Sequence, residues 1–190
     1  MSNSRDFTDK VVIVTGGSGG IGSAICKKFA QFGAKVVITD RNMDQIKKTT
    51  EAVRCLSSKG YEPLEVVADL TKAEDMKRLV QITLNKFGKI DIVVANAGVF
   101  SSALIDNPKL LDIFDYTMMI NVRSVLKLLQ LTVPYLEKSK GSIVVTSSML
   151  SFRPISIYMP YCMSKAALDI MTKCLALNLG PKGIRVNSIK

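Results

Sequence analysis

The chain has 190 residues, no histidine, and 26 lysines and arginines against 16 aspartates and glutamates, for a formal charge of +10. Its length suits a single domain that buries a substantial core. The absence of histidine excludes Ser-His triads, Cys-His dyads and histidine-ligated metal sites, so proton transfer near neutral pH must use other side chains.

Short apolar runs alternate with longer helical patterns along the chain. Strands are predicted at residues 11–14, 36–38, 64–68, 90–95, 141–146 and 183–189. Helices are predicted at residues 21–32, 43–58, 73–87, 110–136 and 160–179, three of which are followed directly by glycine.

The strands are continuous apolar runs, such as Val11-Val12-Ile13-Val14, so we expect both faces of the sheet to be covered. The strict alternation of strands and helices predicts an α/β fold with a Rossmann-type, doubly wound parallel sheet. Ligands bind such sheets at the carboxyl ends of the strands. The ends of the first five strands should therefore form the functional edge.

A glycine-rich loop joins the first strand to the first helix. It reads Thr15-Gly16-Gly17-Ser18-Gly19-Gly20-Ile21-Gly22. Glycines let the backbone approach a pyrophosphate, and a helix N-terminus offers free N–H groups. The loop therefore predicts a dinucleotide site, with cofactor contacts from Gly16, Ser18, Gly20, Ile21 and Gly22.

Two aspartates end the next strands and bear on the cofactor. Asp40 is placed to accept hydrogen bonds from the adenosine ribose and to repel a 2′-phosphate, which favours NAD over NADP. Arg41 follows it and could instead bind that phosphate. Asp69 is placed to bond the adenine, although a role in capping the next helix is equally open.

Tyr161 and Lys165 lie one turn apart on the last predicted helix. A phenol normally titrates near ~10, and a nearby cation lowers that value. By itself such a pair is usually a solvated surface pair. Whether this pair is catalytic depends on the motifs around it.

The motifs occur in a characteristic order: the loop at 15–22, Asn96-Ala97-Gly98, Ser148, and Tyr161-x-x-x-Lys165. In this combination the chain resembles the short-chain dehydrogenase/reductase family, from about residue 10 to residue 190. The resemblance implies hydride transfer between a nicotinamide cofactor and a CH–OH or C=O group. It also implies structural and cofactor-side roles for Asn96, Ala97 and Gly98.

The resemblance further implies a catalytic set. Tyr161 would be the acid or base, and Lys165 would lower its pKa and bond the nicotinamide ribose. Ser148 would hold the substrate oxygen, and Asn121 would hold a water that links Lys165 to solvent. Alternatively, Ser148 caps a loop and Asn121 is a buried polar anchor. The mostly apolar segment Met149–Ile155 favours an apolar secondary alcohol or ketone as substrate.

The chain stops at Lys190, where the family normally continues into a Pro-Gly turn, a lid loop, a helix and a seventh strand. We therefore expect six strands with the usual seventh missing, in one dinucleotide-binding and catalytic domain (residues 1–190) that is incomplete at its C-terminal end. The chain is then either part of a full enzyme or a short form that binds the dinucleotide with little turnover.

Other partners receive little support from the sequence. The basic residues are scattered in pairs along helices without interleaved aromatics, so no nucleic acid is expected. No apolar run approaches the ~20 residues that span a bilayer, so no membrane contact is expected. Four cysteines without metal-ligand spacing predict no metal site and a reducing, cytoplasmic location. The resemblance implies a homo-oligomer through the helices at 110–136 and 160–179.

Overall fold

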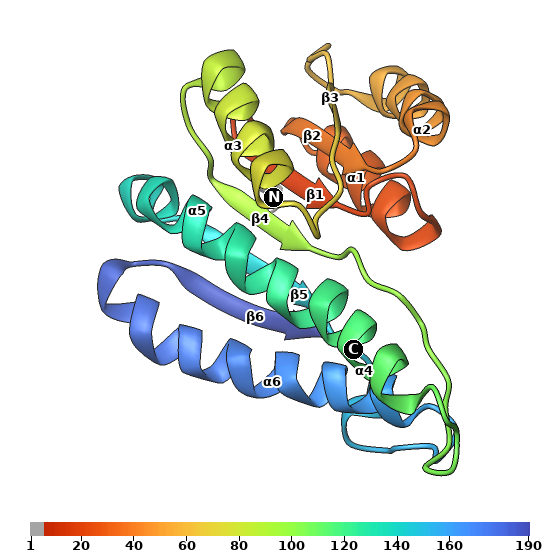
Figure 1. The fold of residues 1–190 in the computed structure, drawn as a ribbon. Coiled ribbons are helices and arrows are strands. Elements are labelled where there is room, and N and C mark those ends of the chain that lie inside the picture. The colour runs from red at the N-terminus through yellow and green to blue at the C-terminus, as the bar shows by residue number, and fades with distance from the viewer. Residues whose placement is uncertain (1–5) are drawn as a thin grey trace.

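The computed structural model describes residues 6–190, which contain a six-stranded parallel sheet of order β3-β2-β1-β4-β5-β6 (Figure 1). All five neighbouring pairs are parallel. The strands are β1 Val11–Thr15, β2 Lys35–Asp40, β3 Leu64–Val67, β4 Ile92–Ala95, β5 Ser142–Thr146 and β6 Arg185–Ile189. The strand order reverses between β1 and β4, which confirms the doubly wound topology and places its switch point beside β1.

The helices follow the predicted pattern with one difference. They are α1 Gly20–Gln31, α2 Met43–Leu56, α3 Ala73–Phe87, α4 Leu110–Met118, α5 Ser124–Ser139 and α6 Met159–Leu179. The helix predicted over residues 110–136 is α4 and α5 joined by a π-helical segment, Met119–Arg123. Such segments carry one extra residue per turn and often mark functional sites. Here the segment contains Asn121.

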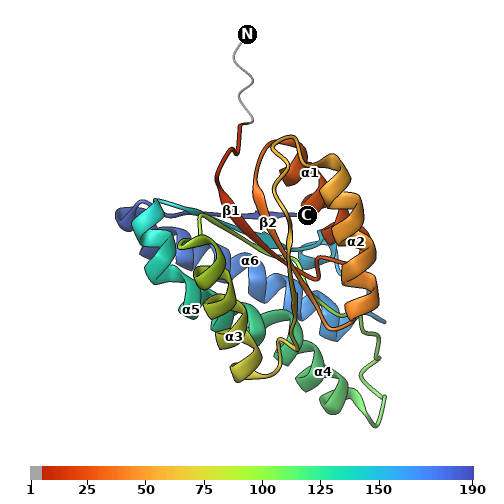
Figure 2. The ribbon, with the colours of Figure 1, turned by 90° about the horizontal axis from the view of Figure 1, so that it is seen from above.

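Helices cover the two faces of the sheet unequally. Seen from above, α1 and α2 lie on one side, and α3 to α6 lie on the other (Figure 2). Val12, Val14 and Ile38 pack toward α1 and α2, whereas Ile13 and Val93 pack toward the larger layer. Alternate residues of one strand thus enter opposite cores, which is why β1 reads as a continuous apolar run.

The expectation that both faces are covered is wrong for β6. This edge strand buries Val186, whereas Arg185, Asn187 and Ile189 are exposed. The strand has mostly polar residues on its open face, unlike the apolar runs of the central strands. Across the described residues 6–190, no helix is both long and apolar enough to cross a membrane.

Candidate active site

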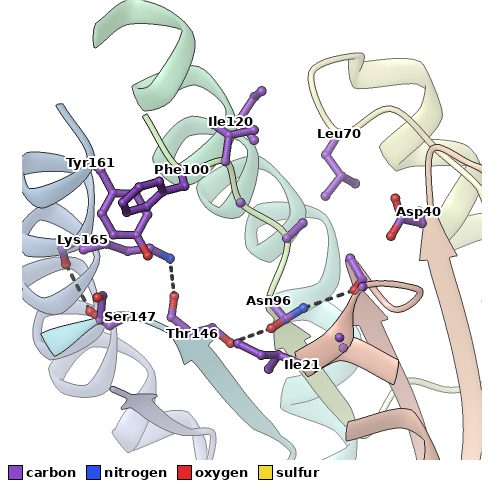
Figure 3. A pocket seen from close by; sticks show the side chains of 18 of the residues that line it. Ile21, Asp40, Leu70, Asn96, Phe100, Ile120, Thr146, Ser147, Tyr161 and Lys165 are labelled. Atoms are coloured by element: carbon purple, nitrogen blue, oxygen red, sulfur yellow. Dashed lines mark hydrogen bonds between the residues drawn. The ribbon is translucent and has the colours of Figure 1, made fainter. Parts of the chain in front are cut away.

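A cleft of about 850 Å³ runs along the carboxyl ends of the strands (Figure 3). The glycine-rich loop and Asp40 lie at one end, and Tyr161 and Lys165 lie at the other. Most of the predicted site residues line it: Gly16, Gly20, Ile21, Gly22, Asp40, Asp69, Asn96, Ala97, Gly98, Ser148, Tyr161 and Lys165. Ser18 and Asn121 are not among the residues that line it.

Different physical reasons account for glycine at different positions of the loop. Gly16 has φ +61°, and a Cβ there would meet the Ala97 Cα at 2.9 Å. A Cβ at Gly22 would collide with the Gly16 carbonyl. A Cβ at Gly20, however, would meet nothing within 4 Å. The protein's own packing therefore does not require glycine at position 20, which lines the cleft at the first turn of α1.

The start of α1 provides donors at this point. The first helical hydrogen bond runs from the Ser23 amide to the Gly19 carbonyl at 2.7 Å. The amides of residues 20–22 precede it and belong to the free N-terminal donors of a helix. An open backbone surface, free N–H groups and the positive end of a helix dipole fit a pyrophosphate.

Asp40 is held in place by the loop itself. Its Oδ2 accepts from the Ser18 hydroxyl at 2.6 Å, and its Oδ1 accepts from the Arg41 amide at 2.7 Å. Ser18 therefore orients Asp40 rather than lining the cleft. Oδ2 also accepts from the Ser18 amide at 3.4 Å, so Oδ1 is the carboxylate oxygen that keeps a lone pair for a ligand hydroxyl. Arg41 also lines the cleft, so a negative and a positive side chain both lie at the cofactor end.

Asp69 forms a turn before α3. Its Oδ1 accepts from the Thr71 amide at 3.0 Å and from the Thr71 hydroxyl at 2.8 Å. These bonds hold the pKa of Asp69 below its usual value. The N-cap position of α3 is Lys72, so the helix-cap alternative is wrong in detail. Asp69 stabilises the preceding turn and still lines the cleft.

Asn96 ties three strand ends together behind the cleft. Its Nδ2 donates to the Thr15 carbonyl at 3.1 Å and lies 3.3 Å from the Gly16 carbonyl, while its Oδ1 accepts from the Thr146 hydroxyl at 3.2 Å (Figure 3). The Thr15 hydroxyl in turn accepts from the amides of Asn96 and Ala97. The ends of β1, β4 and β5 are thereby fixed relative to one another.

Lys165 is a nearly buried cation, with 4% of its surface exposed. Its Nζ donates to the Thr146 carbonyl at 2.7 Å and lies 5.5 Å from the centre of the Tyr161 ring. Burial lowers the pKa of Lys165 to about 8, and the carboxylate of Asp169 opposes part of that shift. The chain therefore has an amine that titrates near neutral pH without any histidine.

Tyr161 is half-buried, and its ring is held from the side by Phe100. The ring centres of Phe100 and Tyr161 are 4.7 Å apart in an edge-on arrangement, and Tyr158 lies 4.6 Å from Phe100 on another side. Aromatic pairs prefer such geometry. Because Phe100 is itself 60% exposed, it forms an apolar wall beside the phenol.

The adjacent serines have different environments. The Ser147 hydroxyl is buried and donates to the Lys165 carbonyl at 3.3 Å. The Ser148 hydroxyl accepts from the Leu150 amide at 3.2 Å and keeps its own proton. Both the capping role and the cleft position expected for Ser148 are therefore present. Of the two serines, Ser148 has a donor free for a ligand oxygen.

Asn121 is buried near the end of β4, and nearly all of its side-chain hydrogen-bonding capacity is used by protein partners. Its Oδ1 accepts from the Val99 amide at 2.8 Å, and its Nδ2 donates to the Val99 carbonyl and the Ser164 hydroxyl, each at 3.0 Å. The anchor alternative is thus observed. A water at this side chain would have to use the remaining lone pair of Oδ1.

Several residues of the cleft were not predicted from the sequence. They include Thr146, which ends β5, Leu70, which follows Asp69, and Phe100. The rule that ligands bind at strand ends was a signal for Thr146 and Leu70. Phe100 lies two residues beyond Gly98, and no motif distinguishes it. Within residues 6–190 no group of three or more potential metal ligands was found.

Comparisons with known proteins agree with this geometry. The family model for short chain dehydrogenases matches residues 10–190. Dehydrogenase/reductase SDR family member 4 from Pongo abelii is 38% identical over 192 residues, which cover 100% of this chain and 67% of that protein.

Solved structures share the fold closely. An NAD+-bound xylitol dehydrogenase is 33% identical with a TM-score of 0.90, covering 97% of this chain and 70% of that one. A short chain dehydrogenase from Burkholderia cenocepacia in complex with NADP is 37% identical with a TM-score of 0.87, covering 95% and 73%. The chain belongs to the short-chain dehydrogenase/reductase family of NAD(P)-dependent oxidoreductases.

Proposed function

We propose that the chain transfers a hydride between NAD and the CH–OH or C=O group of an apolar secondary alcohol or ketone. The observation that carries this proposal is the buried Lys165 beside Tyr161, in a cleft whose other end is the glycine-rich loop. Bound there, the nicotinamide cofactor supplies the hydride chemistry, and the protein orients the reactants and moves a proton.

The cofactor would lie along the cleft. Gly20, Ile21 and Gly22 would hold the pyrophosphate, Asp40 the adenosine ribose and Asp69 the adenine. Gly16 and the strand-end residues Asn96, Ala97 and Gly98 would shape the wall beside it. Asp40 supports NAD, because its charge would repel a 2′-phosphate. Arg41 at the same end is the feature that favours NADP.

Tyr161 would give its proton to the substrate oxygen in reduction and take it back in oxidation. The ammonium of Lys165, 5.5 Å from the centre of the Tyr161 ring, would stabilise negative charge that develops on the phenol oxygen during the transfer. Ser148 would donate its free proton to the same oxygen and stabilise charge there. Asn121 would hold Val99 and Ser164 in place behind Lys165, with a water at its Oδ1 as the proton relay.

The substrate side supports an apolar ligand. Phe100 and Met149 line the cleft next to Tyr161, and both are more than half exposed. Exposed apolar side chains at a cleft wall favour burial against an apolar ligand surface. Neither side chain carries a hydrogen-bond donor for a polar substrate group.

A second function is a dinucleotide-binding module with little or no turnover. The cofactor end of the cleft favours it, because the loop glycines and Asp40 there would hold a dinucleotide whether or not a reaction follows. Single-turnover mixing of stoichiometric NADH with a panel of apolar ketones separates the two. Oxidation of bound NADH supports the enzyme, whereas tight binding without oxidation supports the module.

We also propose a homo-oligomer through α5 and α6, which cover the same face of the sheet (Figure 2). Met163, Ile170 and Leu177 are exposed at seven-residue spacing along α6, at 48%, 59% and 82%. Leu126 on α5 is 46% exposed. An apolar stripe on a helix is typical of an interface. The cytoplasmic location expected from composition stays a prediction.

Tyr161→Phe should lower the rate of ketone reduction by about a thousandfold, because the proton donor is lost. The dissociation constant for NADH should change less than about twofold, since the ring remains. Steady-state rates and NADH fluorescence measure both. Tyr158→Phe is the control, because that tyrosine packs on the same Phe100 ring outside the cleft. Full activity in Tyr161→Phe would overturn the mechanism.

Asp40→Asn should weaken NAD binding and strengthen NADP binding, each by about tenfold, because the repulsion of a 2′-phosphate is removed. Fluorescence titration with the reduced cofactors measures the change. Ser18→Ala, which removes the 2.6 Å bond and keeps the charge, should retain the preference for NAD. Tighter binding of NADPH than NADH to the unaltered chain would contradict the assignment of Asp40.

The buried Lys165 should make stability depend on pH. Unfolded lysine keeps its proton to pH about 10.5, whereas folded Lys165 loses it near pH 8. Between these values the unfolded state binds more protons, so the free energy of unfolding rises with pH. The unaltered chain should therefore gain about 3 kcal/mol relative to Lys165→Met between pH 8 and 10.5.

Urea unfolding of both proteins across this range measures the difference, and groups common to both cancel. A stability difference between them that does not change with pH would show that Lys165 keeps an ordinary pKa.

Ile170→Glu should convert the homo-oligomer to monomers, because a charge would be buried in the apolar stripe. Sedimentation velocity measures the assembly. Lys86→Glu on α3 is a matched exposed control and should leave the assembly unchanged. Sedimentation of the unaltered chain as a monomer at micromolar concentration would refute the interface.

A further inference from the structure

A polar cluster lies beside the turn that carries Ser148. Its centre is Asp169, one helical turn beyond Lys165 on α6, with a side chain that is 14% exposed. The Oδ2 of Asp169 lies 2.8 Å from the Nζ of Lys190, directly after β6. The same ammonium lies 4.7 Å from the ring centre of Phe152, at the end of the turn.

The hydroxyls of Ser147 and Ser151 face the same carboxylate. Burial alone would raise the pKa of Asp169, but Lys190 and the Ser151 and Ser147 hydroxyls hold it below its usual value. In the described chain, the Asp169 Oδ1 and the Ser151 Oγ are buried without a hydrogen bond of ordinary geometry. Asp169 is thus charged at neutral pH and adjoins both ends of the turn.

Two hydrogen bonds attach the start of the turn to β6 and α6. The Ser147 amide donates to the Ile189 carbonyl at 2.8 Å, and the Ser147 hydroxyl donates to the Lys165 carbonyl. Beyond it, Ser148 is fully extended, with φ −160° and ψ 153°, and leads into the 3₁₀ turn Met149–Ser151. Asp169 is the charged side chain of α6 that adjoins this turn at its Ser151 end.

We propose that Asp169 is a positioning residue that holds the turn from Ser147 to Ser151 against α6 and so fixes the Ser148 hydroxyl relative to Tyr161. Asp169 does not line the cleft, so it acts only through the turn. The catalytic meaning of this inference rests on the proposed function. The structural part, the attachment of the turn, does not.

The physical reason is the strength of hydrogen bonds to a charged acceptor. Such bonds contribute about twice as much as neutral ones. Asparagine in place of Asp169 keeps the size of the side chain but loses the charge and one acceptor. Lys190 would then lose its 2.8 Å ion pair and Ser151 its charged neighbour, and the turn would open more often.

Hydrogen exchange tests the attachment directly. The turn protects the amides of Leu150, Ser151, Phe152 and Arg153 through bonds of 3.0–3.3 Å to Ser148 and Met149. In Asp169→Asn these amides should exchange about tenfold faster, while those of β4 and α5 remain unchanged. Asp115→Asn, an exposed aspartate of α4, is the matched control and should change nothing.

A second variant decides the matter if Asp169→Asn does not fold. Lys190→Met removes the cation and leaves the carboxylate with its serines, so the same amides should exchange about threefold faster. Unchanged exchange of this turn in the variants that fold would overturn the proposal. So would a uniform rise in exchange across the whole chain, because Asp169 would then be merely structural.

Kinetics test the consequence for the reaction. In Asp169→Asn, kcat should fall about tenfold with the KM for the cofactor unchanged, because small displacements of a reacting group slow the chemical step. A rise in the cofactor KM with kcat retained would overturn the positioning role. If the unaltered chain shows no turnover, the proposed function fails, whereas the exchange experiment still decides the attachment.

Discussion

The side chain of Asn96 makes the contact on which both halves of the site depend. It bonds the end of β1 through the Thr15 carbonyl and the end of β5 through the Thr146 hydroxyl. Thr146 also accepts the hydrogen bond of Lys165, so one short chain of bonds joins the glycine-rich loop to the proton-transfer end. A buried polar network of this kind holds its geometry only when every member is satisfied. The distance across the cleft is therefore set by strand ends rather than by loops.

The burial of Lys165 gives this chain a substitute for histidine. An exposed lysine stays charged throughout the physiological range, whereas desolvation brings the pKa of Lys165 to about 8. Its ammonium lies 5.5 Å from the ring centre of the neighbouring Tyr161. The same desolvation lowers the free energy of unfolding below that pH, because the buried amine is then charged.

Much of the site follows from local rules that the sequence displays. A parallel sheet sends every strand end to one edge, so the glycine-rich loop, Asp40, Asp69 and the residues after β4 and β5 had to converge. The π-helical segment was not predictable, because residues 110–136 keep a helical pattern throughout and the extra residue is accommodated by packing. Phe100 was missed for a related reason: an aromatic residue in a loop carries no signal until its neighbours are known.

The sequence by itself determined the family, the doubly wound parallel sheet and most of the groups at the cleft, because glycine conformations, apolar periodicity and motif spacing are local properties. Only the tertiary structure decided what each polar group does. Ser18 donates to Asp40, and the Asn121 amide bonds Val99 and Ser164. Ser148 rather than Ser147 keeps a hydroxyl proton free for a ligand. These outcomes depend on partners that are distant along the chain and close in space. A local sequence pattern does not show which of these partners each polar group will bond.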